Sequence, residues 1–303
     1  MPLPITEVLA AHDQLAEAKA VQARTRLGPY MVNTMLAGAY IGVAVVLLLL
    51  ASGPFIAAKS PATKLVQGSV FGVALTLVVF AGAELFTGNL MVMAQGLTSR
   101  SVSGMQAGLV WVSSLVGNLA GSVLFAALVA ASGVINAGAE PGKQTVFMTA
   151  LAGIVKTKAS LTGGQLFFRA ILCNFLVCLA LWMAARTKSD AAKLIVLWWA
   201  LLAFVASGFE HSVANMTVFS VGIFTHTQGA TWSALWHNLE YTVPGNIVGG
   251  AVMVGLAYSY IGDAALSLPR WRRAVALPAV DLTERPERPL RVRARAANGN
   301  GAG

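Results

Sequence analysis

The sequence predicts an all-α membrane protein with six transmembrane helices, arranged as two inverted three-helix repeats whose second and fifth helices are broken. Hydrophobic residues make up 56% of the 303 positions, and charged residues only 11%. Soluble domains carry about 25% charged residues. The charges collect at the ends and in short gaps between apolar runs, which are long enough to cross a bilayer. Two of these runs are interrupted by the same motif, which indicates the repeat.

The chain has three parts, and its six apolar runs all lie in the middle one. They cover residues 30–51, 65–97, 104–131, 166–185, 194–224 and 235–261. We expect an N-terminal amphipathic helix (1–28), which either packs on the bundle with a solvated face or lies in the membrane interface. A membrane domain (29–263) and a basic, disordered tail (264–303) follow. The stretch 132–165 reads as a polar connection. The excess of Lys and Arg on the N-terminal side predicts an inner (plasma) membrane protein with both termini in the cytoplasm.

The fifth run contains the most unusual stretch of the chain, which extends from Gly208 to Met216. Glu210 and His211 stand side by side in the middle of an apolar segment. Ionisable side chains at that depth are costly and generally serve a function. The glycine before them and the polar residues after them are typical of a helix that breaks to line a cavity. We therefore expect His211 to lie on the path of a small solute.

The second run carries a matching interruption. Gly82, Glu84 and Asn89 form the pattern G-x-E-x4-N, which recurs about 126 residues later, and in each half the next span carries G-N-x-x-G, at Gly117 and Gly245. With three spans in each half, the second copy is inverted relative to the first. Inverted repeats with paired broken helices place the substrate site where the breaks meet. The helix-break residues that we identify are Glu84, Gly88, Asn89, Gly208 and Asn215.

These motifs resemble the formate/nitrite transporter family over residues 30–261. The segments that carry the resemblance are Phe71–Leu75, Glu84–Asn89, Gly208–Met216 and Gly245–Gly249, and other stretches look more like the nitrite branch than the formate branch. The resemblance implies a homopentamer of aquaporin-like protomers. It also implies a channel or transporter for a small monovalent anion, with nitrite as the favoured substrate and a proton as the second transported species.

The resemblance also implies roles for individual residues. His211 would donate a proton to the anion and hydrogen-bond Thr87. Lys158 would attract anions in the outer vestibule, and Glu210 and Asn174 would orient the histidine and its neighbours. Two apolar constrictions would exclude hydrated ions, and they match Phe71, Leu75, Leu85, Phe86, Val177 and Phe204.

Other interpretations stay open at this point. Formate or hydrosulfide could be the substrate, or the pore could carry a neutral small solute. Glu84 and Glu210 could be structural carboxylates at the helix breaks, and we interpret Asn118 and Asn246 as helix-packing residues. No nucleophile or metal-ligand spacing is visible, so we expect neither an enzyme nor a cofactor. Much of the net charge of +9 lies in the tail, which indicates contact with membrane lipid rather than nucleic acid.

Overall fold

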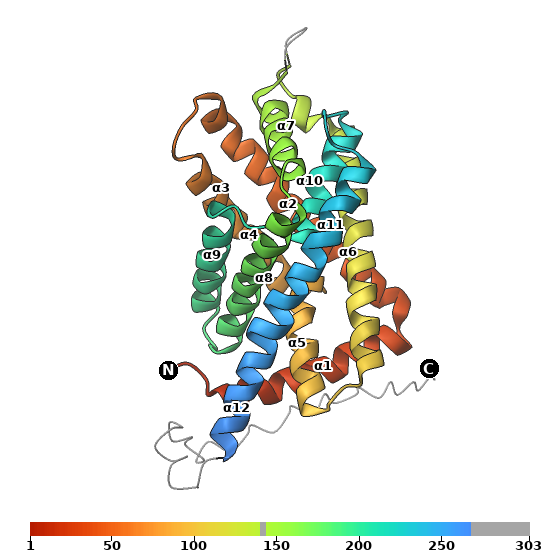
Figure 1. Cartoon of the computed structure of the whole chain (residues 1–303), viewed down its shortest axis with the longest axis vertical. Coiled ribbons are helices and arrows are strands. Elements are labelled where there is room, and N and C mark those ends of the chain that lie inside the picture. The colour runs from red at the N-terminus through yellow and green to blue at the C-terminus, as the bar shows by residue number, and fades with distance from the viewer. Residues whose placement is uncertain (140–143, 268–303) are drawn as a thin grey trace, which may run out of the picture. The chain divides into compact units, whose positions relative to one another are not determined.

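The computed structural model describes residues 1–139 and 144–267, and these residues form helices joined by short turns (Figure 1). Most of the predicted tail therefore lies outside the described residues. The helices are α1 (Ile5–Thr25), α2 (Leu27–Ala57), α3 (Thr63–Phe71), α4 (Val73–Phe80), α5 (Phe86–Ser99), α6 (Gly104–Ser132), the 3-10 turn η1 (Val134–Asn136), α7 (Val146–Ala159), α8 (Gly163–Ala185), α9 (Asp190–Ala206), α10 (Ser212–Phe224), α11 (Trp232–Ile247), the π-helix η2 (Val248–Leu256) and α12 (Ala257–Ser267).

The expected crossings are present. Within the described residues, five segments are long and apolar enough to cross a membrane: Leu27–Ala57, Thr63–Phe80, Gly104–Ser132, Gly163–Ala185 and Trp232–Asp263. The remaining apolar run is divided between α9 and α10. The second and fifth crossings are thus the broken ones, as the sequence predicts.

One helix was not expected. Helix α7 lies inside the stretch that reads as a polar connection. Thr145 caps its first turn by accepting a hydrogen bond from the Met148 N–H, and the helix buries Ala150, Leu151 and Val155. Its lysines stand in the last turn, where the helix dipole favours positive charge. The sequence analysis did not identify this helix, because its lysines obscure a short apolar face.

The packing repeats in the two halves. Helix α2 packs on α6, and α8 packs on α11 in the same way. The short helices after the breaks follow the same scheme, since α5 contacts η2 while α10 contacts α6. Helices α3 and α4, which lead into the first break, both pack against α9, which leads into the second. The short helix of each half therefore packs against a long helix of the other half, as expected for inverted repeats.

Each break follows a glycine with a left-handed backbone. Gly82 has φ 77° and Gly208 has φ 73°, and glycine adopts such angles without the strain of a Cβ atom. The helices that follow, α5 and α10, begin inside the protein. Every residue of α10 from Ser212 to Gly222 is buried. The two turns thus bring polar helix starts into the centre of the bundle.

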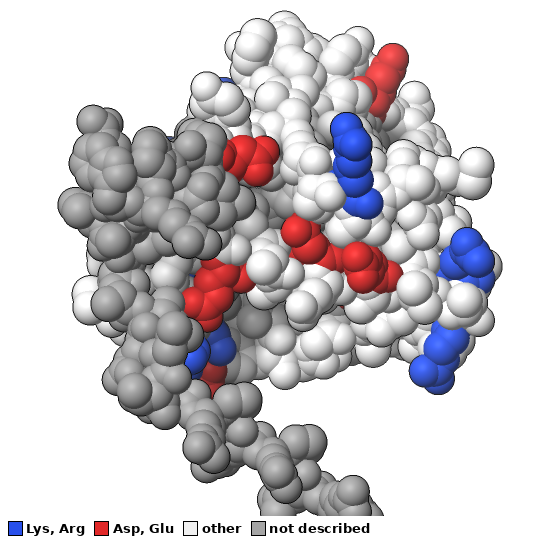
Figure 2. Space-filling model, turned by 90° about the horizontal axis from the view of Figure 1, so that it is seen from below, with Lys and Arg blue, Asp and Glu red and all other residues white. Residues whose placement is uncertain are grey.

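Helix α1 lies across the lower part of the bundle, against α5 and α6 (Figure 1). It buries a stripe that includes Val8, His12, Ala16 and Ala20. Seen from below, the visible part of this face carries separate acidic and basic side chains on a largely uncharged surface (Figure 2). Helix α1 is therefore one part of the packed structure, with one face against the bundle.

Candidate functional site

The two helix breaks meet at a histidine and a threonine. The His211 Nε2 atom lies 3.3 Å from the Thr87 Oγ1 atom, and the two side chains come from opposite halves of the repeat. Both residues are buried, with exposures of 3% for His211 and 0% for Thr87. The prediction that the breaks face each other is confirmed.

The hydrogen bonds of His211 define which ring nitrogen carries the proton. His211 is the N-cap of α10, and its Nδ1 atom accepts a hydrogen bond from the Ala214 N–H at 3.2 Å. An accepting nitrogen holds no proton, so the neutral ring carries its proton on Nε2. The Nε2–H group therefore points at Thr87. A hydroxyl can accept this bond and still donate its own hydrogen to a solute.

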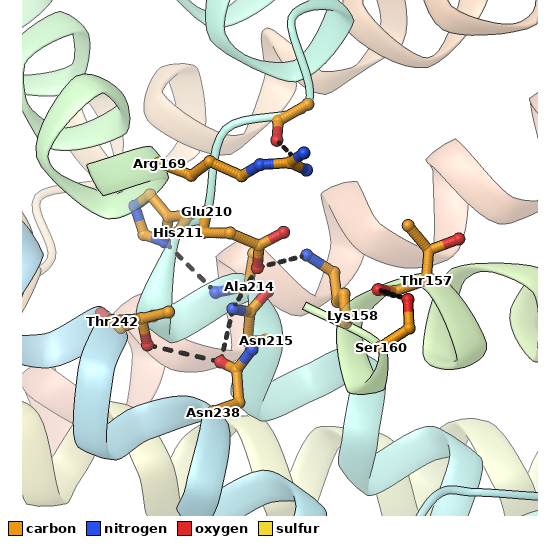
Figure 3. A network of polar contacts seen from close by, with 12 residues as sticks. Thr157, Lys158, Ser160, Arg169, Glu210, His211, Ala214, Asn215, Asn238 and Thr242 are labelled. Carbon is orange, nitrogen blue, oxygen red and sulfur yellow. Dashed lines mark hydrogen bonds and ion pairs between the residues drawn. The ribbon is translucent and has the colours of Figure 1, made fainter. Parts of the chain in front are cut away.

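On one side of this centre, a carboxylate is held by a lysine and an asparagine. Glu210 Oε2 accepts hydrogen bonds from Lys158 Nζ at 2.8 Å and from Asn215 Nδ2 at 2.8 Å (Figure 3). Asn215 Nδ2 also donates to Asn238 Oδ1 at 2.7 Å. Glu210 is 3% exposed, so its charge requires such a partner. The carboxylate of Glu210 thus contacts Lys158 and Asn215 rather than the His211 ring.

The other side of the centre repeats this arrangement with a residue that the sequence analysis missed. Both carboxylate oxygens of Glu84 accept from Lys19 Nζ at 2.6 Å. The Tyr30 hydroxyl donates to Glu84 at 3.4 Å and accepts from Asn89 Nδ2 at 3.5 Å. Lys19 belongs to α1, whose charged positions look like an ordinary solvated face in the sequence. The available signal was the repeat itself, which predicts a counterpart for Lys158.

Two asparagines stabilise the helix breaks by bonding main-chain groups there. The sequence analysis interpreted them only as helix-packing residues. Asn246 Oδ1 accepts from the Ser212 N–H at 3.0 Å, and its Nδ2 donates to the carbonyls of Ala170 at 2.8 Å and Glu210 at 3.2 Å. Asn118 does the same in the first half, with the Phe86 N–H and the carbonyls of Thr34 and Glu84. Helix breaks leave main-chain groups without partners, and these side chains supply them.

Asn174 contacts the centre through main-chain atoms. Its Nδ2 donates to the carbonyls of Thr87 at 3.2 Å and Asn246 at 2.7 Å. It therefore positions the residue opposite His211 and not the imidazole itself. Gly88 follows Thr87 in α5, where a Cβ atom would lie 2.7 Å from Leu181 Cδ1. The absence of a Cβ atom at Gly88 thus leaves room for the Leu181 side chain of α8.

The predicted constriction residues lie in the core around the histidine. Phe71 and Phe204 meet edge to face, with ring centroids 5.8 Å apart, and the Phe204 ring lies 6.0 Å from the His211 ring. The other four are also buried, namely Leu75, Leu85, Phe86 and Val177. An apolar barrier with one polar centre is an arrangement that excludes fully hydrated ions.

A cavity of about 360 Å³ leads to Phe71, Phe204 and His211. We call it the Lys158 vestibule. Besides His211, it is lined by apolar residues together with a small set of polar and charged side chains: Thr63, Lys64, Gln67, Thr157, Lys158, Arg169, Glu210 and Asn215. A smaller cleft of about 220 Å³ lies at the corner of α1 and α2, near the Lys19 side, and is lined by Gln22, Arg26, Pro29, Tyr30 and Asn33. The described residues contain no group of three metal-ligating side chains.

A broken-helix bundle with a cavity leading to a central polar pair defines a membrane channel or transporter. Residues 8–260 match the sequence model of the formate/nitrite transporter family. The chain belongs to this family, whose members are transporters and not enzymes.

Individual relatives agree with this assignment. The nitrite transporter NirC of Escherichia coli (strain K12) is 40% identical over 262 residues, covering 86% of this chain and 91% of the relative. A probable formate transporter of Methanothermobacter thermautotrophicus is 45% identical over 247 residues, covering 77% and 89%. A solved structure described as an FNT family ion channel has a TM-score of 0.75 at 37% identity, covering 84% of this chain and 99% of the other. A pentameric formate channel with formate bound has a TM-score of 0.64 at 29% identity, covering 77% and 96%.

Proposed function

We propose that this protein carries nitrite across the inner membrane, as a homopentamer with one pore in each protomer and both termini in the cytoplasm. The nitrite assignment rests on the similarity to NirC, and the pentamer on the similarity to the pentameric formate channel. Residues 29–263 form the pore domain, flanked by the N-terminal helix (1–28) and a cytoplasmic tail (264–303). The outer face of the spans contacts membrane lipid.

The observation that carries the proposed mechanism is the contact between His211 and Thr87. An anion that reaches this point has lost water against Phe71 and Phe204, and an unpaired charge there is costly. The Nε2–H group of His211 and the hydroxyl of Thr87 replace part of the lost hydration. A second proton on the His211 ring would cost the hydrogen bond from the Ala214 N–H. A proton that arrives on the ring therefore passes readily to the anion, which then crosses as the neutral acid.

The lysine–carboxylate pairs stand at the two approaches to this centre. Lys158 and Lys19 each bind the buried carboxylate of a helix break. They neutralise charges that would otherwise repel an incoming anion. Glu84 and Glu210 in turn fix the positions of the lysines and asparagines around the pore.

The test is a stopped-flow uptake assay in proteoliposomes at several pH values. We expect nitrite flux in the native protein that rises as the pH falls, because a proton accompanies the anion. His211→Ala removes the central donor and abolishes this pH dependence. His237→Ala, which changes a histidine outside the pore, serves as the matched control. Flux that ignores pH and survives His211→Ala would leave the family assignment intact but exclude the proton-donor role.

Formate is the second candidate substrate. The probable formate transporter with 45% identity favours it, and nitrite and formate share a bent shape with two terminal oxygen atoms. The same assay compares nitrite with formate, hydrosulfide and glycerol. Formate uptake that exceeds nitrite uptake reassigns the substrate, whereas glycerol flux without anion flux indicates a neutral-solute pore.

A further inference from the structure

The Lys158 vestibule contains more positive charge than its carboxylate neutralises. Lys64, Lys158, Arg169 and Glu210 all line it. Glu210 uses one oxygen, Oε2, to accept from both Lys158 and Asn215. Within the described residues, no ion pair joins Glu210 to Lys64 or Arg169. Lys158 is thus paired, and the charges left to attract an anion belong to Lys64 and Arg169.

Arg169 holds its guanidinium group at the edge of the second helix break. Its carbonyl accepts from the Glu210 N–H at 3.2 Å. Its Nη1 donates to the Gly208 carbonyl at 3.5 Å, and Figure 3 shows this contact of the guanidinium. The second bond is long for a hydrogen bond and therefore weak. A guanidinium has five N–H donors in one plane. Most of the donors of Arg169 therefore stay free to bind a solute in the cavity that the side chain lines.

The inverted repeat provides an internal comparison. At the first break, the Glu84 N–H donates to the carbonyl of Asn33, just as the Glu210 N–H donates to that of Arg169. Asn33 therefore occupies the position that corresponds to Arg169. The first break keeps its geometry with an asparagine there, so holding a break does not require an arginine. A role in binding explains Arg169 better than a role in folding.

We propose that Arg169 is a docking site for planar anions with two oxygen atoms, such as nitrite or a small carboxylate, at the entrance of the pore. Two parallel N–H groups of the guanidinium match the two oxygens, as in arginine–carboxylate pairs. Lys64 adds charge that draws the anion into the vestibule. This inference rests on the proposed function, because it names how the same substrate is first bound. Lysine cannot replace this fork of two parallel N–H donors, since an ammonium is a point charge.

The experiment measures nitrite uptake against nitrite concentration at constant ionic strength. Arg169→Lys keeps the charge and loses the fork, and we expect the KM to rise roughly tenfold while the maximal flux changes less than about twofold. Arg169→Gln, which also loses the charge, raises the KM further. Lys156→Gln is the matched control, because Lys156 lies in the same turn as Lys158 and is exposed outside the cavity. Its KM stays at the native value.

The outcomes separate this inference from the proposed function. A native KM in Arg169→Lys, with a raised KM only in Arg169→Gln, overturns the two-donor binding of the anion. It shows that only the positive charge at position 169 attracts the anion. A lower maximal flux with an unchanged KM overturns the docking site and assigns Arg169 to the helix break. If Arg169→Lys does not fold, Arg169→Gln carries the test, and an unchanged KM there overturns the docking site. Native protein that carries neither nitrite nor formate overturns the proposed function, and the docking site with it.

Discussion

Replacing Asn246 by alanine tests whether this side chain holds the second helix break. Asn246 is 0% exposed and bonds three main-chain groups: the Ser212 N–H and the carbonyls of Ala170 and Glu210. Leaving a buried polar group without a partner costs about 1–3 kcal/mol in soluble proteins. Hydrogen bonds between membrane helices average about 0.6 kcal/mol. For three bonds with partial relaxation, we expect a loss of about 2–6 kcal/mol in the free energy of unfolding.

The assay is reversible unfolding in SDS–detergent mixtures, followed by circular dichroism. Asn118→Ala should lose a similar free energy, because Asn118 makes the corresponding three bonds. Asn136→Ala is the control, since Asn136 is an exposed residue in the turn η1. A loss below about 1 kcal/mol in both core variants would refute the reasoning, because it lies below even the membrane estimate.

Three further predictions concern the pore and α1. Thr87→Val removes the hydroxyl that His211 contacts, and nitrite flux should fall about tenfold in proteoliposomes, whereas an unchanged flux contradicts the donor role. Phe204→Ala removes one ring of the constriction, and the same vesicles should become permeable to chloride. Vesicles that stay impermeable to chloride would show that other residues form the barrier. Burial lowers the pKa of His12 from its usual 6.5, so protonation favours the released form of α1, and docking weakens as the pH falls below about 6.5. Relative to the intrinsic exchange rate at each pH, the protection of α1 amides from hydrogen exchange should fall there in the native protein but not in His12→Gln.

The breaks and their pairing could be predicted from the sequence because their residues are costly in an apolar environment. Glu84, Glu210 and His211 interrupt long hydrophobic runs, and their spacing repeats. This is enough to indicate two facing breaks. The contact between Thr87 and His211 was implied by the family resemblance and not by the repeat, because Thr87 aligns with Val213 in the second motif.

The groups that hold the breaks could not be predicted, because they act on main-chain atoms far away in the chain. The hydrogen bond between the Ser212 N–H and Asn246 joins residues 34 positions apart, and main-chain groups leave no trace in a sequence. Lys19 was missed for another reason, since its helix has the composition of a solvated segment. Its partner Glu84 lies 65 positions away. The π-helix η2 likewise has no sequence signal that distinguishes it from the α-helix around it.

The way in which Asn118 and Asn246 hold the breaks has a consequence for the redesign of this pore. Both asparagines form hydrogen bonds with main-chain N–H and carbonyl groups, and every amino acid except proline possesses both groups. The turn at each break is therefore specified without the side chains of Leu85, Phe86 or Ser212. Substitutions at those positions therefore act on the packing around the constriction and not on the hydrogen bonds that hold the backbone path. The scaffold can thus acquire a new solute preference, in evolution or in the laboratory, by changing a few lining residues.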